Sequence, residues 1–249
     1  MTWLNDYVTS SGLNGFVVGV SGGVDSALTA TLCAMTGKPV ALVNMPIRQK
    51  EDQFDRSAQQ IGALEKRYPN VTEYTVDLTP SFTQFSRDLP DFAANHALSM
   101  ANTRARLRMT TLYAIGQSKG LLVAGTGNKV EDFGVGFFTK YGDGGVDISP
   151  IADLMKTEVF ELAAFLGVNQ AILDAPPTDG LWEDDRSDEQ QLGATYAELE
   201  WAMTFEGDET TLNDQEKHVL LTYRRFNAMN KHKMIPIPVC TIPKEYKLI

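Results

Sequence analysis

The sequence predicts an α/β fold, with a Rossmann-like parallel sheet flanked by helices. Short β-branched or apolar runs alternate with longer segments of helical period, which is typical of parallel strands joined by crossover helices. With 249 residues, 43% of them hydrophobic, the chain is long enough to bury a sizeable core. We therefore expect a single domain over residues 1–249.

Four apolar runs predict the strands of this sheet, over 15–20 (GFVVGV), 39–45 (PVALVNM), 72–78 (TEYTVDL) and 121–125 (LLVAG). The segments around them repeat apolar residues at helical spacing and predict helices over 24–36, 50–67, 91–118, 153–166, 195–205 and 212–229. The helix over 153–166 has Asp153 near its expected start and Gly167 after its end. These elements alternate as a parallel sheet requires.

Two long segments have almost no period. Residues 126–152 are rich in glycine, and residues 175–193 combine prolines with acidic residues. Connections this long inside a compact domain are usually functional or mobile. We therefore expect part of the functional site in these loops.

The composition excludes several classes of protein. The net charge of -10 argues against a surface that tracks nucleic acid or anionic lipid. Cys33 and Cys240 lie far apart with no metal-ligand spacing, which supports neither a disulfide framework nor a zinc site. The N-terminus lacks a signal-peptide pattern, and no apolar run is long enough to span a bilayer. We expect a cytoplasmic protein that binds neither nucleic acid nor membrane.

Residues 19–26 read GVSGGVDS, between a predicted strand and a predicted helix. A loop at this place has free backbone N–H groups and the positive end of the helix dipole, and its glycines allow an anion to approach closely. Ser21 and Ser26 add hydroxyl donors, and Asp25 is suited to hold Mg²⁺ against phosphate oxygens. A tight turn whose Asp stabilises the helix start is the alternative interpretation. The full string SGGVDS favours a phosphate-binding loop.

This loop lacks the lysine that reaches the terminal phosphate in a Walker A motif. It is therefore better suited to grip pyrophosphate as a leaving group, with the chemistry at the α-phosphate. The expected products of ATP are AMP and pyrophosphate.

Several motifs in order make the chain resemble a known family. SGGVDS is the signature of the PP-loop, or ATP pyrophosphatase, superfamily, whose fold is adenine nucleotide alpha-hydrolase-like. GTGNKVED at 125–132, FFTKYGDGGVDISPIADLMKTEVFELAAFLG at 137–167, PPTDGLW at 176–182 and HK at 232–233 resemble ammonia-dependent NAD⁺ synthetase. The resemblance implies a ligase that adenylates the carboxylate of deamido-NAD⁺ with ATP and lets ammonia displace AMP. It also implies a homodimer with substrate sites near the subunit interface.

The resemblance assigns residues to ATP and to magnesium. The expected ATP contacts are Gly19, Val20, Ser21, Gly22, Gly23, Val24, Asp25, Ser26, Thr126, Lys156 and Thr178. Ser21, Asp25 and Lys156 are expected to act in catalysis. Lys156 lies in the first turn of its predicted helix, where a cation opposes the helix dipole, so a structural reason for it is weak. Asp25 and Glu131 are the expected Mg²⁺ ligands, with Asp132 as a rival because the spacing after Glu131 is one residue longer than the family pattern.

The expected contacts to deamido-NAD⁺ are Arg106, Lys140, Asp147, His232 and Lys233. In the helix that holds NTRARLRM, Arg106 shares a face with Asn102, Met109 and Tyr113. Arg104 and Arg108 point about 200° away by the same period, and we expect a solvated face for them. We expect His232 to bind substrate rather than act as a base, because ammonia that has lost its proton needs little activation.

Alternatives remain open at this point. Another PP-loop ligase, which thiolates tRNA, forms lysidine or aminates as GMP synthetase does, would share SGGVDS and the adenylation step. A non-catalytic ATP-binding module would share the loop alone. At this length we expect no glutamine amidase domain, and hence free ammonia as the nitrogen source. The dimer helices are not fixed by the sequence, although 91–118 and 212–229 are long enough.

Overall fold

The computed structural model of the chain describes residues 1–49, 51–178 and 187–247. The strands are β1 (Gly15–Gly19), β2 (Val40–Asn44), β3 (Val71–Thr75) and β4 (Leu121–Val123). The helices are α1 (Thr2–Ser10), α2 (Val24–Met35), α3 (Glu51–Arg67), α4 (Thr79–Asp88), α5 (Asp91–Ala94), α6 (Ala97–Lys119), α7 (Lys156–Phe165), α8 (Gln170–Leu173), α9 (Asp188–Leu192), α10 (Tyr196–Thr204) and α11 (Asp214–Met234). Short π and 3₁₀ turns are η1 (Val130–Val135), η2 (Glu209–Thr211) and η3 (Lys244–Tyr246).

The four strands form one parallel sheet in the order β3-β2-β1-β4, which confirms the predicted fold class. β1 lies in the interior, and pairs with β2 on one side and with β4 on the other. Every residue of β2 and β4 is buried, as expected for strands covered on both faces. Because β1 and β4 are parallel neighbours, the segments that follow them meet at one edge of the sheet.

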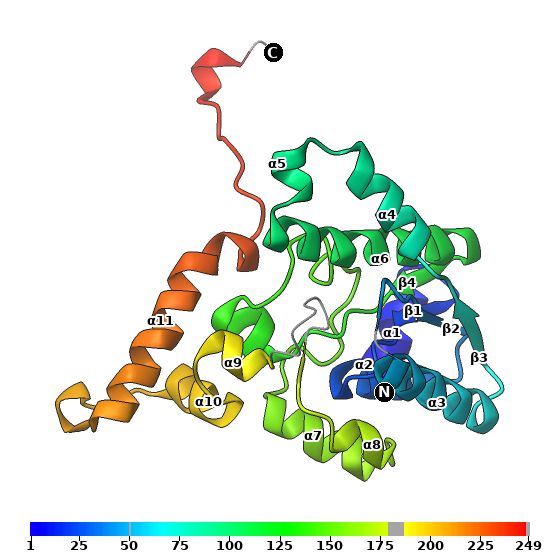
Figure 1. The fold of residues 1–249 in the computed structure, drawn as a ribbon, viewed down its shortest axis with the longest axis horizontal. Helices are drawn as coiled ribbons and strands as arrows, with labels where there is room; N and C mark the ends of the chain where they lie inside the picture. The colour runs from blue at the N-terminus through cyan, green and yellow to red at the C-terminus, as the bar shows by residue number, and fades with distance from the viewer. Residues whose placement is uncertain (50, 179–186, 248–249) are drawn as a thin grey trace.

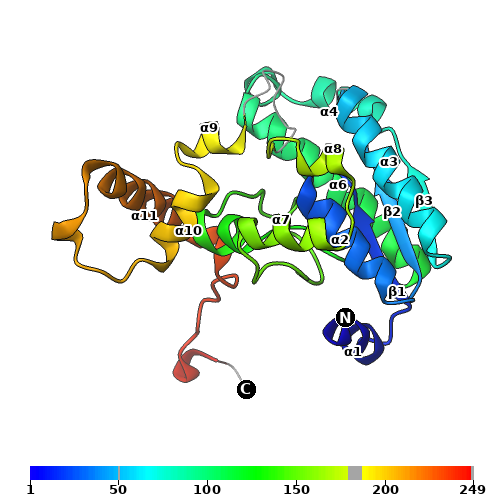
Figure 2. The ribbon, with the colours of Figure 1, turned by 90° about the horizontal axis from the view of Figure 1, so that it is seen from below.

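Helices cover both faces of the sheet (Figures 1 and 2). Phe16 and Val18 of β1 point into a core with α1, α2 and α3, while Val17 points into a second core with α4 and α6. This alternation along β1 follows from the two-residue period of a strand. The sheet is therefore the middle layer, and its carboxyl edge is left for the functional loops.

Beyond the sheet, two further cores carry the C-terminal half. α7 and α8 pack on α2 around Leu28, Ile151 and Val159. α10 and α11 pack on η1 around Val130, Leu199 and Val219, and form an arm that extends to one side of the sheet (Figures 1 and 2). Thus η1 is held between the sheet and this arm.

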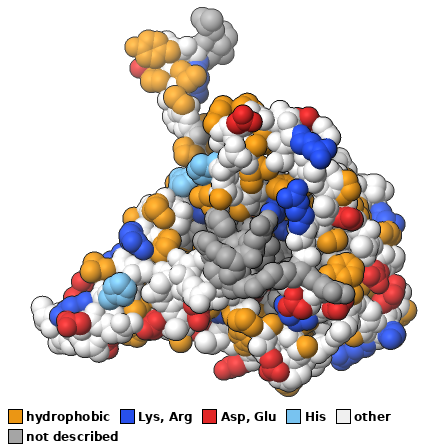
Figure 3. All heavy atoms as spheres, in the orientation of Figure 1, with side chains coloured by type: hydrophobic (Ala, Val, Ile, Leu, Met, Phe, Trp, Pro, Cys, Tyr) orange, Lys and Arg blue, Asp and Glu red, His pale blue; other side chains and the backbone are white. Residues whose placement is uncertain are grey.

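The chain after α11 stands away from the rest of the molecule and is exposed along its described length (Figure 3). It carries apolar side chains, with Val239 84% exposed and Tyr246 76% exposed. Cys240 in this tail is exposed and free, and Cys33 is free and buried in α2. The two cysteines therefore lie in different parts of the molecule, one in the core and one in the exposed tail.

Some predicted boundaries were wrong. The predicted helix 91–118 is divided into α5 and α6, because Nδ1 of His96 accepts a hydrogen bond from the backbone N–H of Ser99 and starts a new helix. α7 begins at Lys156 rather than near Asp153, because Glu158 bonds back to the N–H of Met155. η1 is a π-helical turn in a segment predicted to have no period. α1 and α4 were not predicted. Among the described residues, the structure contains no helix with the length and hydropathy of a membrane span.

Candidate functional site

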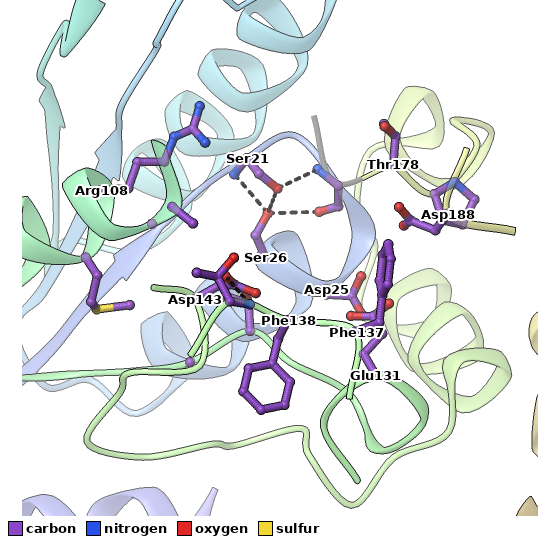
Figure 4. A pocket seen from close by; sticks show the side chains of 18 of the residues that line it. Ser21, Asp25, Ser26, Arg108, Glu131, Phe137, Phe138, Asp143, Thr178 and Asp188 are labelled. Carbon is purple, nitrogen blue, oxygen red and sulfur yellow. Dashed lines mark hydrogen bonds between the residues drawn. The ribbon is translucent and has the colours of Figure 1, made fainter. Parts of the chain in front are cut away.

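A chamber of about 610 Å³ opens at the carboxyl edge of the sheet. Its walls come from distant parts of the chain, as Figure 4 shows for ten labelled residues. They are the loop after β1, the residues that follow β4, one face of α6, the segment 136–146, the start of α7, residues 175–178 and the last turn of α11, with further residues from α3 and α9. A volume of this size is typical of a small-molecule site.

The loop GVSGGVDS forms one wall and is fixed by its own serines (Figure 4). The hydroxyl of Ser26 accepts from the backbone N–H of Ser21 at 3.1 Å and donates to the carbonyl of Gly23 at 3.0 Å. The N–H of Gly23 donates to the hydroxyl of Ser21 at 3.2 Å. Gly22 has φ +85, in the left-handed region that favours glycine, and a Cβ there would lie 2.7 Å from the carbonyl oxygen of Gln53.

This loop leads directly into α2, whose N-terminus faces the chamber. The N-cap residue is Gly23, so no side chain caps the first turn. The early N–H groups of a helix lack intrahelical partners, and together with the dipole they attract anions. This geometry fits a phosphate group, the ligand that the sequence predicts for the loop.

Lys156 lies opposite the loop, with only 3% of its surface exposed. Its Nζ is 2.6 Å from Oδ2 of Asp25 and 3.0 Å from Oε1 of Glu131. Burial alone would lower the pKa of Lys156, but the charges of Asp25 and Glu131 raise it above its ordinary value. The structure thus brings together three residues that the sequence predicted for catalysis and metal binding.

Two carboxylates that contact one ammonium group also fit a metal ion. Asp25 is held by the side-chain amide of Asn128, which donates to its Oδ1 at 2.9 Å. Oxygen ligands suit Mg²⁺, which is commonly held by one or two carboxylates plus phosphates. Among the described residues no group of three or more His, Cys, Asp or Glu side chains could hold a metal. The donor set of Asp25 and Glu131 therefore fits a magnesium ion that comes with a nucleotide.

The structure separates the two rival metal ligands. Glu131 lines the chamber and touches Lys156. The carboxylate of Asp132 lies beside Gly127, where a Cβ on the glycine would be only 2.2 Å from Oδ2 of Asp132. Burial and the nearby carboxylates, Glu131 first, raise the pKa of Asp132 to about 8. This placement favours Glu131 as the ligand.

The π-helical turn η1 sets the position of Glu131. Its backbone N–H donates to Oδ1 of Asn128 at 3.1 Å. From α11, the amides of Asn227 and Asn230 donate to the carbonyls of Gly134 and Val135 at 2.7 and 2.8 Å. Because π turns widen a helix by one residue, they often occur at functional sites.

The two threonines predicted to contact ATP both line the chamber. Thr126 follows β4, and Thr178 lies at the rim on the segment 175–178. The remainder of the motif PPTDGLW, residues 179–182, lies outside the described residues. The described part of the motif thus reaches the same chamber as the loop after β1.

Four of the five residues predicted for deamido-NAD⁺ cluster at another part of the chamber wall. Nζ of Lys140 donates to the carbonyl of His232 at 2.8 Å, and Nε of Arg106 donates to the carbonyl of Lys140 at 3.3 Å. Nζ of Lys233 donates to the carbonyl of Phe138 at 2.8 Å, and burial lowers its pKa. Three cations are thus gathered in an acidic protein.

Asp147 is the exception, because the described chain does not bring it to the chamber. Its Oδ1 accepts from the hydroxyl of Tyr113 at 3.0 Å, and its Oδ2 accepts from the N–H of Val123 at 2.8 Å. It borders a second hollow of about 400 Å³, with Trp3, Tyr7 and Phe133 in its lining. These three aromatic side chains are about half exposed. The prediction that Asp147 contacts deamido-NAD⁺ is not tested by this placement and stays a prediction.

The prediction that Arg104 and Arg108 lie on a solvated face of the helix was wrong. Both are half-buried, whereas Arg106 is exposed. The guanidinium of Arg104 lies 5.1 Å from the ring centre of Phe82. Nε of Arg108 donates to the carbonyl of Met45 at 3.1 Å, and Arg108 lines the chamber. α4, which was not predicted, supplies Phe82 and so buries one side of α6.

Asp188 and Tyr196 are among the polar residues at this site that the sequence analysis missed. Asp188 is buried at the start of α9 and lines the chamber. The hydroxyl of Tyr196 donates to Oε1 of Glu131 at 2.6 Å. Neither residue belongs to a motif, and a tyrosine among apolar helix residues resembles an ordinary core residue. Only the capping pattern SDEQ and TYAE, which starts two helices here, was available as a signal.

Comparisons with known proteins agree with this geometry. The model of the family described as NAD synthase matches residues 1–235. An NH(3)-dependent NAD(+) synthetase from Alkaliphilus metalliredigens is 36% identical and covers 97% of this chain and 96% of its own. One from Syntrophomonas wolfei is 37% identical, with coverages of 99% and 96%. Among solved structures, the NMN synthetase from Francisella tularensis is 31% identical with a TM-score of 0.82, covering 98% of this chain and 94% of that one. An NAD⁺ synthetase from Burkholderia pseudomallei is 26% identical with a TM-score of 0.70, covering 93% and 86%.

Proposed function

Since this chain belongs to the NAD synthase family, we propose that it is a ligase that amidates deamido-NAD⁺ with ammonia and converts ATP to AMP and pyrophosphate. The observation that carries the proposal is one chamber with three parts. The SGGVDS loop forms the first part, and the buried group of Asp25, Glu131 and Lys156 forms the second. The third is the cluster of cationic side chains, Arg106, Lys140 and Lys233.

The first step is attack by a carboxylate oxygen of deamido-NAD⁺ on the α-phosphorus of ATP, with pyrophosphate as the leaving group. The N–H groups of the loop and of the first turn of α2 bind the pyrophosphate oxygens, whose charge grows as the bond breaks. Lys156 brings a fixed positive charge to the same region. Asp25 and Glu131 would hold Mg²⁺, which supplies further charge neutralisation on the phosphates when bound.

The second step converts the mixed anhydride into the amide. The nitrogen of ammonia attacks the carbonyl carbon, AMP leaves with the bonding electron pair, and the nitrogen loses a proton. Adenylation is needed because oxide is a poor leaving group from a carboxylate. No enzyme nucleophile is required, which agrees with the burial of Cys33 in α2 away from the chamber. Arg106, Lys140 and Lys233 are suited to bind the dinucleotide phosphates.

A homodimer fits the placement of Asp147. The hollow beside Asp147 is lined by partly exposed Trp3, Tyr7 and Phe133, which a second copy of the chain would cover. In such a dimer Asp147 would contact dinucleotide held partly by the other subunit. Molar mass from light scattering after size exclusion tests this, and a monomer at all concentrations would contradict it.

Nicotinic acid mononucleotide is the alternative candidate substrate, because the solved structure with a TM-score of 0.82 is described as an NMN synthetase. Nicotinic acid mononucleotide carries the same carboxylate and lacks the adenylate half. We propose the dinucleotide because both curated relatives above are described as NAD(+) synthetases.

The deciding experiment incubates the protein with ATP, Mg²⁺, ammonium and either deamido-NAD⁺ or nicotinic acid mononucleotide, and follows AMP, pyrophosphate and amide product. Equal formation of AMP, pyrophosphate and NAD⁺ is expected, with a higher kcat/KM for the dinucleotide. Glutamine in place of ammonium should give no amide, since we propose that residues 1–249 form a single synthetase domain with no amidase. Two outcomes would contradict the proposal. One is release of pyrophosphate when no carboxylate substrate is present, and the other is no release when such a substrate is present.

A further inference from the structure

The hydroxyl of Tyr196 reaches Glu131 at the chamber wall, although Tyr196 belongs to the core of the C-terminal arm. The residue is 4% exposed. Its hydroxyl lies 2.6 Å from Oε1 of Glu131 and 3.3 Å from Oδ2 of Asp188. A tyrosine hydroxyl has one proton to donate, so the shorter contact identifies Glu131 as its main acceptor.

The backbone around Tyr196 is held firmly. Tyr196 is the first residue of α10, where Thr195 and Glu198 form a reciprocal capping box. Its own N–H donates to Oε1 of Glu189 in α9 at 2.9 Å. Its ring packs in the cluster that contains Leu199. A hydroxyl on so fixed a ring has little freedom to leave Glu131.

The side chain of Tyr196 contacts both the positive charge of Lys156 and the negative charge of Glu131. Nζ of Lys156 lies 4.7 Å from the ring centre of Tyr196, within the range of a cation–π contact. Nζ of Lys156 and the hydroxyl of Tyr196 both bind Oε1 of Glu131. In the described part of the chain these are the two side-chain bonds to Glu131, so its Oε2 keeps its lone pairs for another ligand. One oxygen is anchored while the other is left for a cation.

We infer that Tyr196 is a positioning residue for the cation site, and that it holds Glu131 in the orientation in which this carboxylate and Asp25 bind Mg²⁺ together with the phosphates of ATP. The inference rests on the proposed function, because it takes ATP to be bound with Mg²⁺. Residues that orient a metal ligand in this way tune the metal affinity without touching the metal.

A role as an ordinary core tyrosine would need only one satisfied acceptor, and Asp188 alone would supply it. The short bond goes instead to the carboxylate that Lys156 also touches. The hydroxyl of Tyr196 is therefore committed to the carboxylate of the proposed metal site.

The test measures metal binding directly in Tyr196→Phe, which keeps the ring and removes the hydroxyl. Mn²⁺, as a probe for Mg²⁺, is titrated into the full chain with a non-hydrolysable ATP analogue, and free Mn²⁺ is followed by electron paramagnetic resonance. We expect the Mn²⁺ dissociation constant to rise about 10- to 100-fold. The Mg²⁺ concentration for half-maximal pyrophosphate release should rise in parallel, with kcat at saturating Mg²⁺ largely retained.

Tyr223→Phe is the matched control. Tyr223 is a half-buried tyrosine packed on the same cluster, and its hydroxyl makes no hydrogen bond within the described residues. It should bind Mn²⁺ as the parent does. A parental Mn²⁺ dissociation constant in Tyr196→Phe overturns the inference.

A double-mutant cycle with Glu131→Gln separates positioning from general loosening of the fold. If Tyr196 acts through Glu131, Tyr196→Phe should change Mn²⁺ affinity little when Glu131 is already Gln. An equal loss in both backgrounds overturns the inference. If the parent protein binds Mn²⁺ but makes no NAD⁺, the proposed function is refuted. The Mn²⁺ affinities of the parent and of Tyr196→Phe can still be compared, so the inference about Tyr196 is still tested. A parent that binds no Mn²⁺ even with the ATP analogue overturns the inference itself.

Discussion

The ammonium of Lys156 lies 2.6 Å from the carboxylate of Asp25, although 131 residues separate them in the chain. The same ammonium touches Glu131, so Lys156 lies between two proposed metal ligands. A metal ion and Lys156 carry charge of the same sign. Binding of Mg²⁺ at these carboxylates should therefore turn Lys156 toward the phosphates.

Asp25→Asn should abolish adenylation while the fold survives, because it keeps size and removes the charge that faces Lys156 and Mg²⁺. We expect pyrophosphate release to fall by about 100-fold or more. Release is measured under saturating ATP, with circular dichroism to confirm folding. Asp153→Asn, on a side chain that is 97% exposed, is the control and should behave as the parent. Turnover of Asp25→Asn within a few-fold of the parent would refute the pyrophosphate-binding loop.

Lys156→Met should destabilise the metal-free protein, because it leaves two carboxylates facing each other without a cation. Breaking a fully buried pair costs about 3–5 kcal/mol, and since Asp25 and Glu131 are 18% and 16% exposed we expect a loss of about 2–3 kcal/mol. Urea unfolding in EDTA measures this, and added Mg²⁺ should restore part of the loss.

Lys129→Met is the control for that experiment, because Lys129 pairs with the exposed Asp153 at 2.9 Å. An exposed pair contributes about 0–1 kcal/mol, so its loss should be small and insensitive to Mg²⁺. If Mg²⁺ failed to restore any stability to Lys156→Met, the two carboxylates would not form a metal site.

Glu131→Gln and Asp132→Asn should separate the two candidate metal ligands. Glu131 lines the chamber, whereas Asp132 lies against Gly127. Glu131→Gln should raise the Mg²⁺ concentration for half-maximal activity at least about tenfold. Asp132→Asn should leave it near the parental value. The opposite ranking in a Mg²⁺ titration would assign the metal to Asp132.

Gly22→Ala should impair ATP binding, because the alanine would adopt a φ of +85 and its Cβ would meet the backbone of Gln53. The strain should cost about 1–3 kcal/mol of folding free energy, and the displaced loop should raise KM for ATP. Gly37→Ala is the matched control, since Gly37 has φ +74 with nothing within 4 Å. It should show similar backbone strain and an unchanged KM. Equal KM values for ATP in Gly22→Ala and Gly37→Ala would show that this loop does not bind ATP.

Much of the fold followed from local patterns in the sequence. The strands are short apolar runs, and β1, β2 and β4 lie where the runs predicted them. The SGGVDS loop was predictable because glycine, serine and a following helix are sufficient to make an anion site. Thr126, Glu131 and Lys156 were assigned to the site by the resemblance. Only Lys156 also had a local signal, because a cation in the first turn of a helix opposes the dipole.

What could not be predicted depends on contacts between distant segments. Tyr196 and Glu131 are 65 residues apart, and nothing in either local sequence records their bond. The π-helical turn η1 depends on amides of α11 that bind its carbonyls. The sequence predicted solvent around Arg104 and Arg108, because the helical period shows which residues share a face of the helix but not which element packs on that face. α4 covers that face here.

The pairing of β1 with β4 has a consequence for how the protein acquires activity during folding. Val17 and Val123 align only after a long loop of chain has closed, and such non-local pairing forms slowly compared with local contacts. The helices and the β1–β2 pair can be native while the loops after β1 and β4 are still apart. We therefore expect ATP binding to be recovered late in refolding, because it requires the loops after both β1 and β4.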